Sequence, residues 1–488
     1  MRQRILLAAS ALLLLLGACQ SPAKPAPGSS SEESSAGLTE PSSPETADLM
    51  KEEPIQYYVP DPEDVSRYIK VSSEELDENL HYWIVDPEDS SRYIEVVLTR
   101  SGKRGEEVAL TGSGKDEEYE YVIWTGPNLT QERLEEVLAE VMEGYSASAV
   151  SVAVIEDGQV TASGAWGWAV KKEREMTADT KVRIASMTKV VLGMCAMAME
   201  EDGLLELDAP LSTYWGENAR NPRSKTQPSA YTLMTHTSSL TDQGNQSGLS
   251  NLRSRLQKTS SWRSMEPGNG GYWYYSNFGF CVLGTTLELA AGQVLDSYLQ
   301  SRYLEPMGIR GSLFPGNLEA DEVACLYNSS GAVERSAQTQ TSQGVPSEIG
   351  QGASYFPGGL TISAPDLARL LSILVNDGVY NGVRYLSQES VADMETPRFA
   401  VDYLEGTYPF EQCLVLRHQE DLMGRSSVFY HTGSAYGVHA LLSYDPEEGD
   451  GVVVITVGAP RRVNDRGLYT LCADLSERLY AEMRGGLA

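Results

Sequence analysis

The stretch Ser186-Met187-Thr188-Lys189 opens an apolar run from Val190 to Met199, and together they predict a helix that begins at the serine. At a spacing of three residues, the serine and lysine side chains project from the same face of such a helix. A partly desolvated lysine can accept a proton from a serine hydroxyl, and the backbone N–H groups at the helix start lie beside the serine oxygen. Taken alone, the pattern leaves a nucleophile and an ordinary helix cap equally open.

A second pattern, Tyr275-Ser276-Asn277, precedes a predicted helix over Phe278 to Leu289. A tyrosine beside a lysine cation can have a lowered pKa and relay protons. An asparagine amide can orient both the lysine and a substrate carbonyl. The aromatic neighbours at 272–274 leave open that this tyrosine only packs.

A third pattern, His431-Thr432-Gly433-Ser434, lies before two predicted strands at 440–444 and 452–457. A strand that passes an active site can donate a backbone N–H to an oxyanion, and glycine permits the close approach. The hydroxyl of Thr432 and the ring of His431 can bind a substrate carboxylate or carbonyl. A glycine turn within a strand is the alternative interpretation.

In this order, the three patterns resemble the active-site triplet of serine β-lactamases and penicillin-binding DD-peptidases. The tyrosine form resembles class C β-lactamases, low-molecular-weight DD-peptidases and related esterases and D-aminopeptidases. The resemblance covers about residues 130 to 485 and includes the connecting phrases at 203–210, 233–240 and 357–368. It implies a β-lactamase/DD-peptidase-like fold that needs no metal and no organic cofactor.

The resemblance also implies a role for each residue of the triplet. Ser186 would be the acylated nucleophile, with Lys189 and Tyr275 as the base pair. Asn277 would orient them, and the backbone N–H groups of Ser186 and Ser434 would form the oxyanion hole.

The histidines include one departure from the family pattern. Efficient β-lactamases have a lysine where this chain has His431, and histidine is mostly neutral near pH 7. This difference favours a DD-peptidase, esterase or D-aminopeptidase over a strong β-lactamase. His236 lies in a connecting phrase and is interpreted as structural, and no partner is predicted for His439.

The order of the elements predicts the fold class. A helix near 134–141 and strands at 149–155 and 159–168 lie at one end, and the two later strands and a helix over 468–483 lie at the other. Between them the chain is rich in helices and loops. We therefore expect an α/β (α+β) fold, with an antiparallel sheet assembled from both ends and an all-helical subdomain inserted.

The N-terminus resembles that of a bacterial lipoprotein. Arg2 and Arg4 precede the apolar run Ile5 to Leu16, and small residues lead to Cys19. Residues 1–18 are expected to be a signal peptide, and Cys19 to carry the lipid on the extracytoplasmic face of the cell membrane. An ordinary secretory peptide is the alternative. Residues 19–50, rich in Ser, Pro and Glu, predict a disordered tether.

Residues 51–127 predict a separate β-rich accessory segment. Tyr57 to Val71 recurs as Tyr82 to Val96 with ten of fifteen positions identical, and each copy is expected to form a strand, an Asp-Pro turn and a strand. Residues 128–488 are assigned to the hydrolase domain.

Composition limits the partners. The net charge of −30 disfavours nucleic acid, and the five cysteines beyond Cys19 form no cluster suited to a metal or a disulfide framework. The chain is thus expected to be a lipid-anchored serine hydrolase that acts through an acyl-enzyme on an amide or ester. A D-amino-acid peptide of the cell-wall type is the first substrate expected, with peptidoglycan as a partner and the lipid as the only membrane contact. A small ester, weak β-lactam turnover, or an inactive peptidoglycan-binding or sensor lipoprotein are the alternatives.

Overall fold

The structure, a computed structural model, describes the backbone of five strands between residues 57 and 111, and residues 129–483 except 218 and 402–408. The chain divides into two compact units, Met1–Gly126 and Pro127–Ala488. The predicted signal peptide, Cys19 and the tether lie outside the described residues.

The first unit contains an antiparallel sheet with the strand order β2-β1-β3-β4-β5. Its strands are β1 (Tyr57–Asp61), β2 (Asp64–Val71), β3 (His81–Val85), β4 (Tyr93–Leu98) and β5 (Val108–Thr111).

Each copy of the internal repeat forms one hairpin of this sheet. Equivalent residues of the repeat pair with each other in both hairpins. Tyr57 pairs with Val71 in the first copy, and Tyr82 pairs with Val96 in the second. The copies meet at Tyr58 opposite Trp83, which are equivalent positions of the repeat. The two hairpins are therefore related by approximate two-fold symmetry.

The second unit is built on a nine-stranded sheet with the order β15-β16-β17-β18-β19-β20-β6-β7-β8, in which every pair is antiparallel. These strands are β6 (Ala149–Glu156), β7 (Gln159–Val170), β8 (Arg174–Glu175), β15 (Phe399–Val401), β16 (Phe410–Gln412), β17 (Arg417–Leu422), β18 (Arg425–Ala435), β19 (Val438–Asp445) and β20 (Asp450–Val457). Strand β20 pairs with β6, so the prediction of a sheet built from both ends is confirmed.

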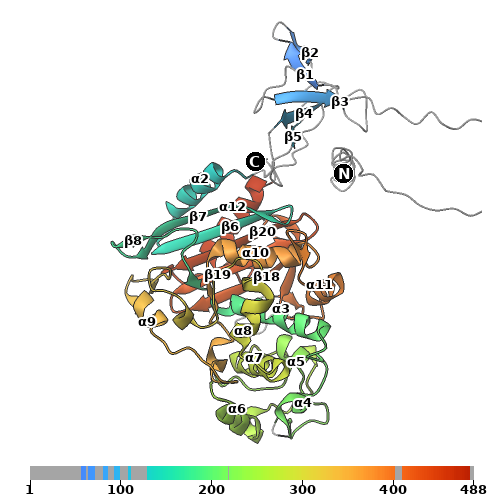
Figure 1. The fold of residues 1–488 in the computed structure, drawn as a ribbon, viewed down its shortest axis with the longest axis vertical. Helices are drawn as coiled ribbons and strands as arrows, with labels where there is room; N and C mark the ends of the chain where they lie inside the picture. Colours follow the sequence, from blue (N-terminus) through green and yellow to red (C-terminus); the bar gives the residue numbers. More distant parts are fainter. Residues whose placement is uncertain are drawn as a thin grey trace, which may run out of the picture. The chain divides into compact units, whose positions relative to one another are not determined.

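Alternation along β6 shows how the sheet separates two apolar cores. Val150, Val152 and Val154 belong to one core, whereas Ala153 and Ile155 belong to the other. Helices α2 (Gln131–Met142) and α12 (Thr470–Met483) cover the first side, and α10 (Ala364–Val375) packs on the second (Figure 1). Both faces of the sheet are thus covered by helices.

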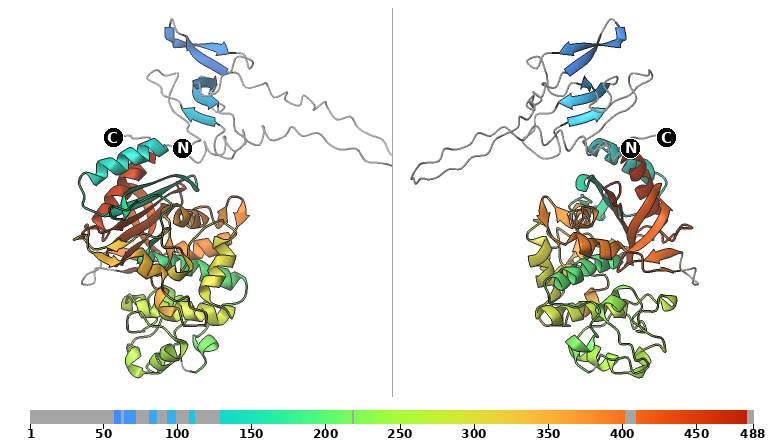
Figure 2. Two further views of the ribbon diagram at one scale, coloured as in Figure 1. Left: turned by 60° about the vertical axis from the view of Figure 1, so that its left-hand side comes forward. Right: turned by 90° about the vertical axis from the view of Figure 1, so that its right-hand side faces the viewer.

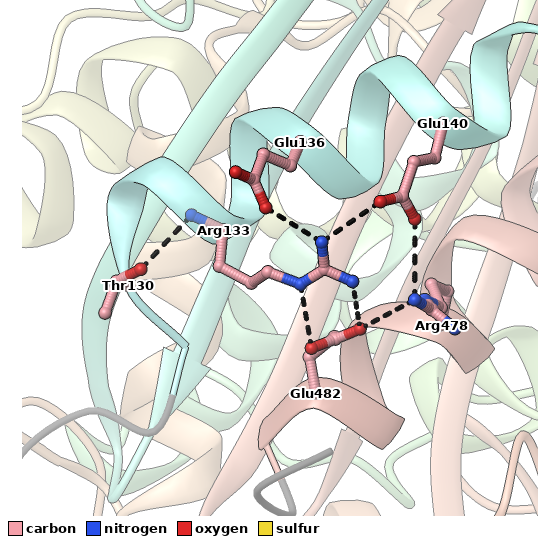
Figure 3. A network of polar contacts seen from close by, with 6 residues as sticks. All are labelled: Thr130, Arg133, Glu136, Glu140, Arg478 and Glu482. Atoms are coloured by element: carbon pink, nitrogen blue, oxygen red, sulfur yellow. Dashed lines mark hydrogen bonds and ion pairs between the residues drawn. The ribbon is translucent and has the colours of Figure 1, made fainter. Parts of the chain in front are cut away.

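Helices α2 and α12 are also joined by an ion network on their outer surface (Figure 3). Thr130 caps α2 by accepting a hydrogen bond from the backbone N–H of Arg133. The Arg133 guanidinium donates to both carboxylate oxygens of Glu482, at 3.1 and 2.8 Å. It also contacts Glu136 and Glu140.

The helical subdomain lies on the side of the sheet away from α2 and α12 (Figure 2). Its helices and those around it are α3 (Thr188–Glu201), α4 (Ser212–Trp215), α5 (Ala230–Met234), α6 (Leu249–Leu256), α7 (Asn277–Ala291), α8 (Leu295–Leu299), α9 (Ala337–Thr341) and α11 (Gln388–Glu395). Two-stranded pairs link the loops, namely β9 (Val182–Arg183) with β12 (Thr361–Ile362), β10 (Leu326–Tyr327) with β11 (Val333–Arg335), and β13 (Val379–Tyr380) with β14 (Val383–Arg384).

Helices α3 and α7 are buried along most of their length, which agrees with their nearly continuous apolar sequences. Within the described residues, no single helix is long and apolar enough to cross a membrane, and one sharply bent pair, Asn277–Ala291 with Leu295–Leu304, passes on length and composition alone.

Candidate active site

Ser186 lies in the short 3-10 helix η1 (Ala185–Met187), directly before α3. The sequence predicts a helix that begins at this serine, and the structure places it in a tighter turn at that position. Lys189 follows three residues later in the first turn of α3, and its Nζ lies 3.1 Å from Ser186 Oγ, so the two side chains face the same way. The preceding Ala185 has a φ of 49°, a left-handed conformation that is strained for alanine.

Two glycines allow neighbouring segments to approach this strained turn closely. A Cβ on Gly433 of β18 would lie 2.5 Å from the carbonyl oxygen of Ile184. A Cβ on Gly358 would lie 3.1 Å from the carbonyl carbon of Ala185. Any side chain at Gly433 would therefore push β18 away from the nucleophile turn.

Lys189 is fully buried and its ammonium has three hydrogen-bond acceptors. Its Nζ lies 3.1 Å from Ser186 Oγ, 3.1 Å from Asn277 Oδ1 and 2.6 Å from the carbonyl oxygen of Pro357. An ammonium has three donors, so these bonds satisfy it and fix its direction. The amine is therefore aimed at the serine oxygen by two protein groups on its other sides.

Tyr275 completes the contact, because its phenol oxygen lies 2.9 Å from Ser186 Oγ. Burial by itself would raise the pKa of Tyr275. The nearby Lys189 ammonium and hydrogen bonds to the phenol outweigh that effect, and the pKa is lowered below its ordinary value of 10. The Tyr275 phenol therefore loses its proton more easily than the phenol of a free tyrosine.

Three contacts position the loop that carries Tyr275. The indole N–H of Trp273 donates to Gln412 Oε1 at 2.9 Å. The His236 ring packs against the Tyr275 ring with their centroids 4.4 Å apart, and its Nδ1 accepts from the backbone N–H of Ser276 at 3.3 Å. His236 therefore holds the tyrosine, a more specific role than the structural one expected.

Asn277 is the first residue of α7, and the start of that helix is fixed by hydrogen bonds. The Ser276 hydroxyl caps the helix by accepting from the N–H of Gly279 at 2.9 Å. Asp242 accepts from the N–H of Phe278 at 2.8 Å. Asn277 can therefore direct its amide at Lys189 without distorting the backbone.

These groups open into a cavity of about 530 Å³. Of the β18 residues predicted for the site, Thr432 and Ser434 line it and Gly433 does not. The described lining consists of Ser186, Trp273, Tyr275, Asn277, Phe410, Arg417, Tyr430, Thr432, Ser434, Arg461, Val463, Arg466, Gly467 and Tyr469.

Comparison with known proteins identifies the family of the chain. Residues 134–475 match the family model described as Beta-lactamase. The chain belongs to the β-lactamase family.

Three curated relatives of this β-lactamase-family chain differ in their names. Protein Rv1367c of Mycobacterium tuberculosis H37Rv is 29% identical over 46% of the chain, and the match covers 61% of that protein. Esterase EstB of Burkholderia gladioli is 27% identical over 40% of the chain and 54% of its own length. The D-alanyl-D-alanine-carboxypeptidase/endopeptidase AmpH of Escherichia coli K12 is 27% identical over 28% of the chain and 37% of its own length. The chain thus spans about half the length of these relatives.

A solved structure agrees on the β-lactamase-type fold. The D-amino acid amidase of Ochrobactrum anthropi SV3 aligns over 73% of this chain and 99% of its own, with a TM-score of 0.56 and 21% identity. The predicted fold class, an antiparallel sheet with helices and a helical subdomain, is therefore confirmed.

In this β-lactamase-family site, His431 lies behind the cavity surface. Its side chain is buried, it is not among the lining residues, and its Nδ1 lies 2.7 Å from the carbonyl oxygen of Thr432. Burial, and then the charges of Arg417 and Lys189, hold the pKa of His431 well below its ordinary range. The imidazole therefore stays uncharged and adds no cation to the cavity.

Several residues of the site carry no motif in the sequence. Arg417 lies on β17, and Arg461 and Arg466 lie in the loop between β20 and α12. The Ser434 hydroxyl has His439 Nδ1 as a partner at 3.1 Å, although no partner is predicted for that histidine. The carbonyl of Pro357 could have been suspected, because a connecting phrase of the family begins there.

The described residues provide no metal site, since no group of three or more His, Cys, Asp or Glu side chains converges among them. The five cysteines from Cys195 onward are free and buried. The chemistry that this arrangement offers is therefore that of an activated hydroxyl beside an amine and a phenol.

Proposed function

We propose that the chain is a serine hydrolase that cleaves an amide or ester through an acyl-enzyme on Ser186. The observation that carries this proposal is the contact of three groups. The Ser186 oxygen lies within hydrogen-bond distance of both the Lys189 amine and the Tyr275 phenol. A helix cap needs neither of these partners, so the alternative interpretation of the first sequence pattern does not account for them.

Proton transfer begins at Tyr275. As a phenolate beside the Lys189 ammonium, it accepts the Ser186 proton while Oγ attacks the substrate carbonyl. A C–O bond forms and the carbonyl electrons move to the oxygen. The backbone N–H groups of Ser186 and Ser434 are the proposed donors to that oxyanion, which fits the place of both residues in the cavity lining.

Release follows by the reverse transfer. The tetrahedral centre collapses, the bond to the leaving amine or alcohol breaks, and the Tyr275 phenol gives its proton to the leaving atom. A water molecule then attacks the acyl group and gives a proton back to the phenolate. The bond between Ser186 Oγ and the acyl carbon breaks, the acid product leaves, and Ser186 takes from Tyr275 the proton that came from the water.

The proposed substrate is a D-amino-acid peptide of the cell-wall type, cleaved at its C-terminal bond. The name of the AmpH relative supports this choice, and an exported hydrolase would meet such peptides. A small ester is the second candidate, supported by the EstB relative. Rapid β-lactam turnover is not expected, because His431 is uncharged.

The test uses covalent trapping and turnover together. Wild type should gain the mass of one fluorophosphonate adduct, and Ser186→Ala should gain none. Ser387→Ala is the matched control, because it removes a hydroxyl that caps α11 and does not line the cavity. Wild type should also turn over D-Ala-D-Ala peptides, D-amino-acid amides or p-nitrophenyl esters faster than nitrocefin. An adduct that persists in Ser186→Ala, or no adduct in wild type, would refute the assignment and favour an inactive binding protein.

We further propose that Cys19 carries a lipid that holds the enzyme at the extracytoplasmic face of the membrane. The support is the leader, with Arg2 and Arg4 before an apolar run and a cysteine after small residues. Cys19→Ser should move the protein from the membrane fraction to the soluble fraction. Unchanged membrane association would contradict the anchor.

A further inference from the structure

The cavity beside Ser186 is lined by three arginines and, among its described lining, by no acidic residue. Arg417 is half-buried, and Arg461 and Arg466 are exposed at its edge. The whole chain contains 68 acidic and 38 basic residues. A cluster of three guanidinium groups without a carboxylate is therefore opposite in sign to the rest of the molecule.

None of these three guanidinium groups forms an ion pair with a carboxylate of the described residues. Arg417 lies over the Phe410 ring, 4.6 Å from its centroid. Arg466 donates to the backbone carbonyl of Asp421 at 3.0 Å. These contacts orient the Arg417 and Arg466 side chains without a neutralising carboxylate, so their charges remain available to a ligand.

Burial and the charges of Arg417 and Arg461 lower the pKa values of two histidines near the reaction centre. After burial, Arg417 is the largest cause of the lowered pKa of His431. Arg461 adds to burial in lowering the pKa of His439 to about 4, and His439 is the hydrogen-bond partner of Ser434. Arg417 therefore acts on β18, which carries the proposed oxyanion donor, and Arg461 acts on the β19 residue that contacts the Ser434 hydroxyl.

The arginines come from two different walls of the cavity. Arg417 belongs to β17, and the other two belong to the loop that joins β20 to α12. One carboxylate is satisfied by a single guanidinium that binds it with two parallel hydrogen bonds. Three guanidinium groups on two walls exceed what one carboxylate requires.

We propose that the substrate of the hydrolase carries two acidic groups on the part that fills this cavity, one for Arg417 and one for Arg461 with Arg466. A peptide whose leaving residue has an acidic side chain as well as its terminal carboxylate has this chemistry. This inference rests on the proposed function and names its substrate class.

The arginine cluster acts on a ligand at shorter range than the charge of the whole molecule. A net charge of −30 repels a dianion at long range, but salt at physiological strength screens charges beyond about 8 Å. A cluster inside a cavity acts below that distance and concentrates the anion locally. Preference for the dianion should therefore weaken as salt is added.

The test compares peptides that share one acyl part and differ in the leaving residue. D-alaninamide carries no carboxylate, D-alanine carries one, and D-glutamate carries two. In wild type, kcat/KM should be at least about tenfold higher for the D-glutamate peptide than for the D-alanine peptide, since each well-formed charged contact contributes about that factor.

Variants then locate the effect. Arg461→Gln and Arg466→Gln should each remove most of the preference for the D-glutamate peptide over the D-alanine peptide. Arg462→Gln is the matched control, because that arginine is adjacent and exposed but does not line the cavity. It should keep the wild-type preference.

Two results would overturn the inference. Equal kcat/KM for one and two carboxylates in wild type would show that the cluster does not select a dianion. A loss of preference in Arg462→Gln as large as in Arg461→Gln would show that only the general charge matters. Either result with an intact fluorophosphonate adduct would leave the proposed hydrolase standing, whereas loss of the adduct would refute both.

Discussion

Two polar networks in the molecule each surround one cation with three partners, and they differ in nearly everything else. On the outer surface Arg133, with 30% of its side chain exposed, contacts the carboxylates of Glu136, Glu140 and Glu482. In the site Lys189 is fully buried, and all three of its acceptors are uncharged groups. The partly exposed cation is bound to three carboxylates, whereas no hydrogen-bond acceptor of the buried one is a carboxylate.

The difference indicates what each network is for. In the surface network, the hydrogen bond from Arg133 is the main cause of the lowered pKa of Glu482, so the cation and the anion stabilise each other. In the site, burial of a cation without a counter-ion opposes folding, and its charge instead lowers the pKa of Tyr275. The buried network is therefore explained by reactivity and the exposed one by attachment of two helices.

The largest expected effect comes from removing the buried cation. Lys189→Met should lower kcat/KM by about 10³ to 10⁴, because the phenol loses the charge that lowers its pKa. The free energy of unfolding should stay within about 2 kcal/mol of wild type, because loss of a buried charge offsets two unsatisfied acceptors. Turnover assays and urea unfolding measure the two quantities.

Lys181→Met is the control for that variant, because Lys181 is also nearly buried but pairs with Glu322 at 3.6 Å and lies outside the cavity lining. It should retain turnover. Strong destabilisation of Lys189→Met would contradict the division of roles between the two networks.

The second prediction concerns pH. Only the phenolate of Tyr275 accepts the serine proton, so activity should rise as pH rises through a pKa below 10. Tyr275→Phe should lower kcat/KM by about 10² to 10³ and remove this limb of the profile. The exposed neighbour Tyr274 does not line the cavity, so Tyr274→Phe should leave the profile unchanged. If the rise of activity with pH persisted in Tyr275→Phe, a group other than Tyr275 would have to accept the serine proton.

The third prediction tests the contact that brings β18 to the nucleophile. Gly433→Ala places a methyl group 2.5 Å from the carbonyl oxygen of Ile184, so one of the two segments must shift. We expect kcat/KM to fall about tenfold or more and the free energy of unfolding to fall by about 1 to 3 kcal/mol. Gly344→Ala meets no atom within 4 Å and should change neither. Wild-type turnover in Gly433→Ala would show that the close approach is not needed.

Local patterns explain which parts of the fold could be predicted. The hairpin of β6 and β7 follows from a turn at Asp157-Gly158 between apolar runs, and α12 follows from its periodic apolar residues. Strands β15 and β16 are three residues long and add to the sheet edge without a pattern of their own. Their position depends on packing of Phe410 and Val401 against Trp273, which no local pattern contains.

The same limit applies within the site. Ser186 and Lys189 carry one recognisable spacing and Tyr275 and Asn277 another. The family resemblance joined these two patterns, and the structure brings the four residues together. Arg417 carries no such spacing, because it reaches the cavity only through the pairing of β17 with β18. Spacing along the chain reveals groups that share a helix turn, whereas contacts across a sheet depend on tertiary structure.

The smallest expected effect belongs to the surface network. Glu482→Gln removes the carboxylate that binds Arg133 twice. We expect unchanged turnover and a Tm lower by about 2 °C or less, since ion pairs near the surface contribute little. Because the pKa of Glu482 is lowered in the folded state, its contribution is present above the unfolded pKa of about 4.5 and is lost as pH falls through the lowered folded value. The difference in Tm between variant and wild type should therefore shrink from pH 7 to pH 3, and also on adding salt at pH 7. A difference that stayed constant across this range would mean that packing of the side chain, and not its charge, joins α2 to α12.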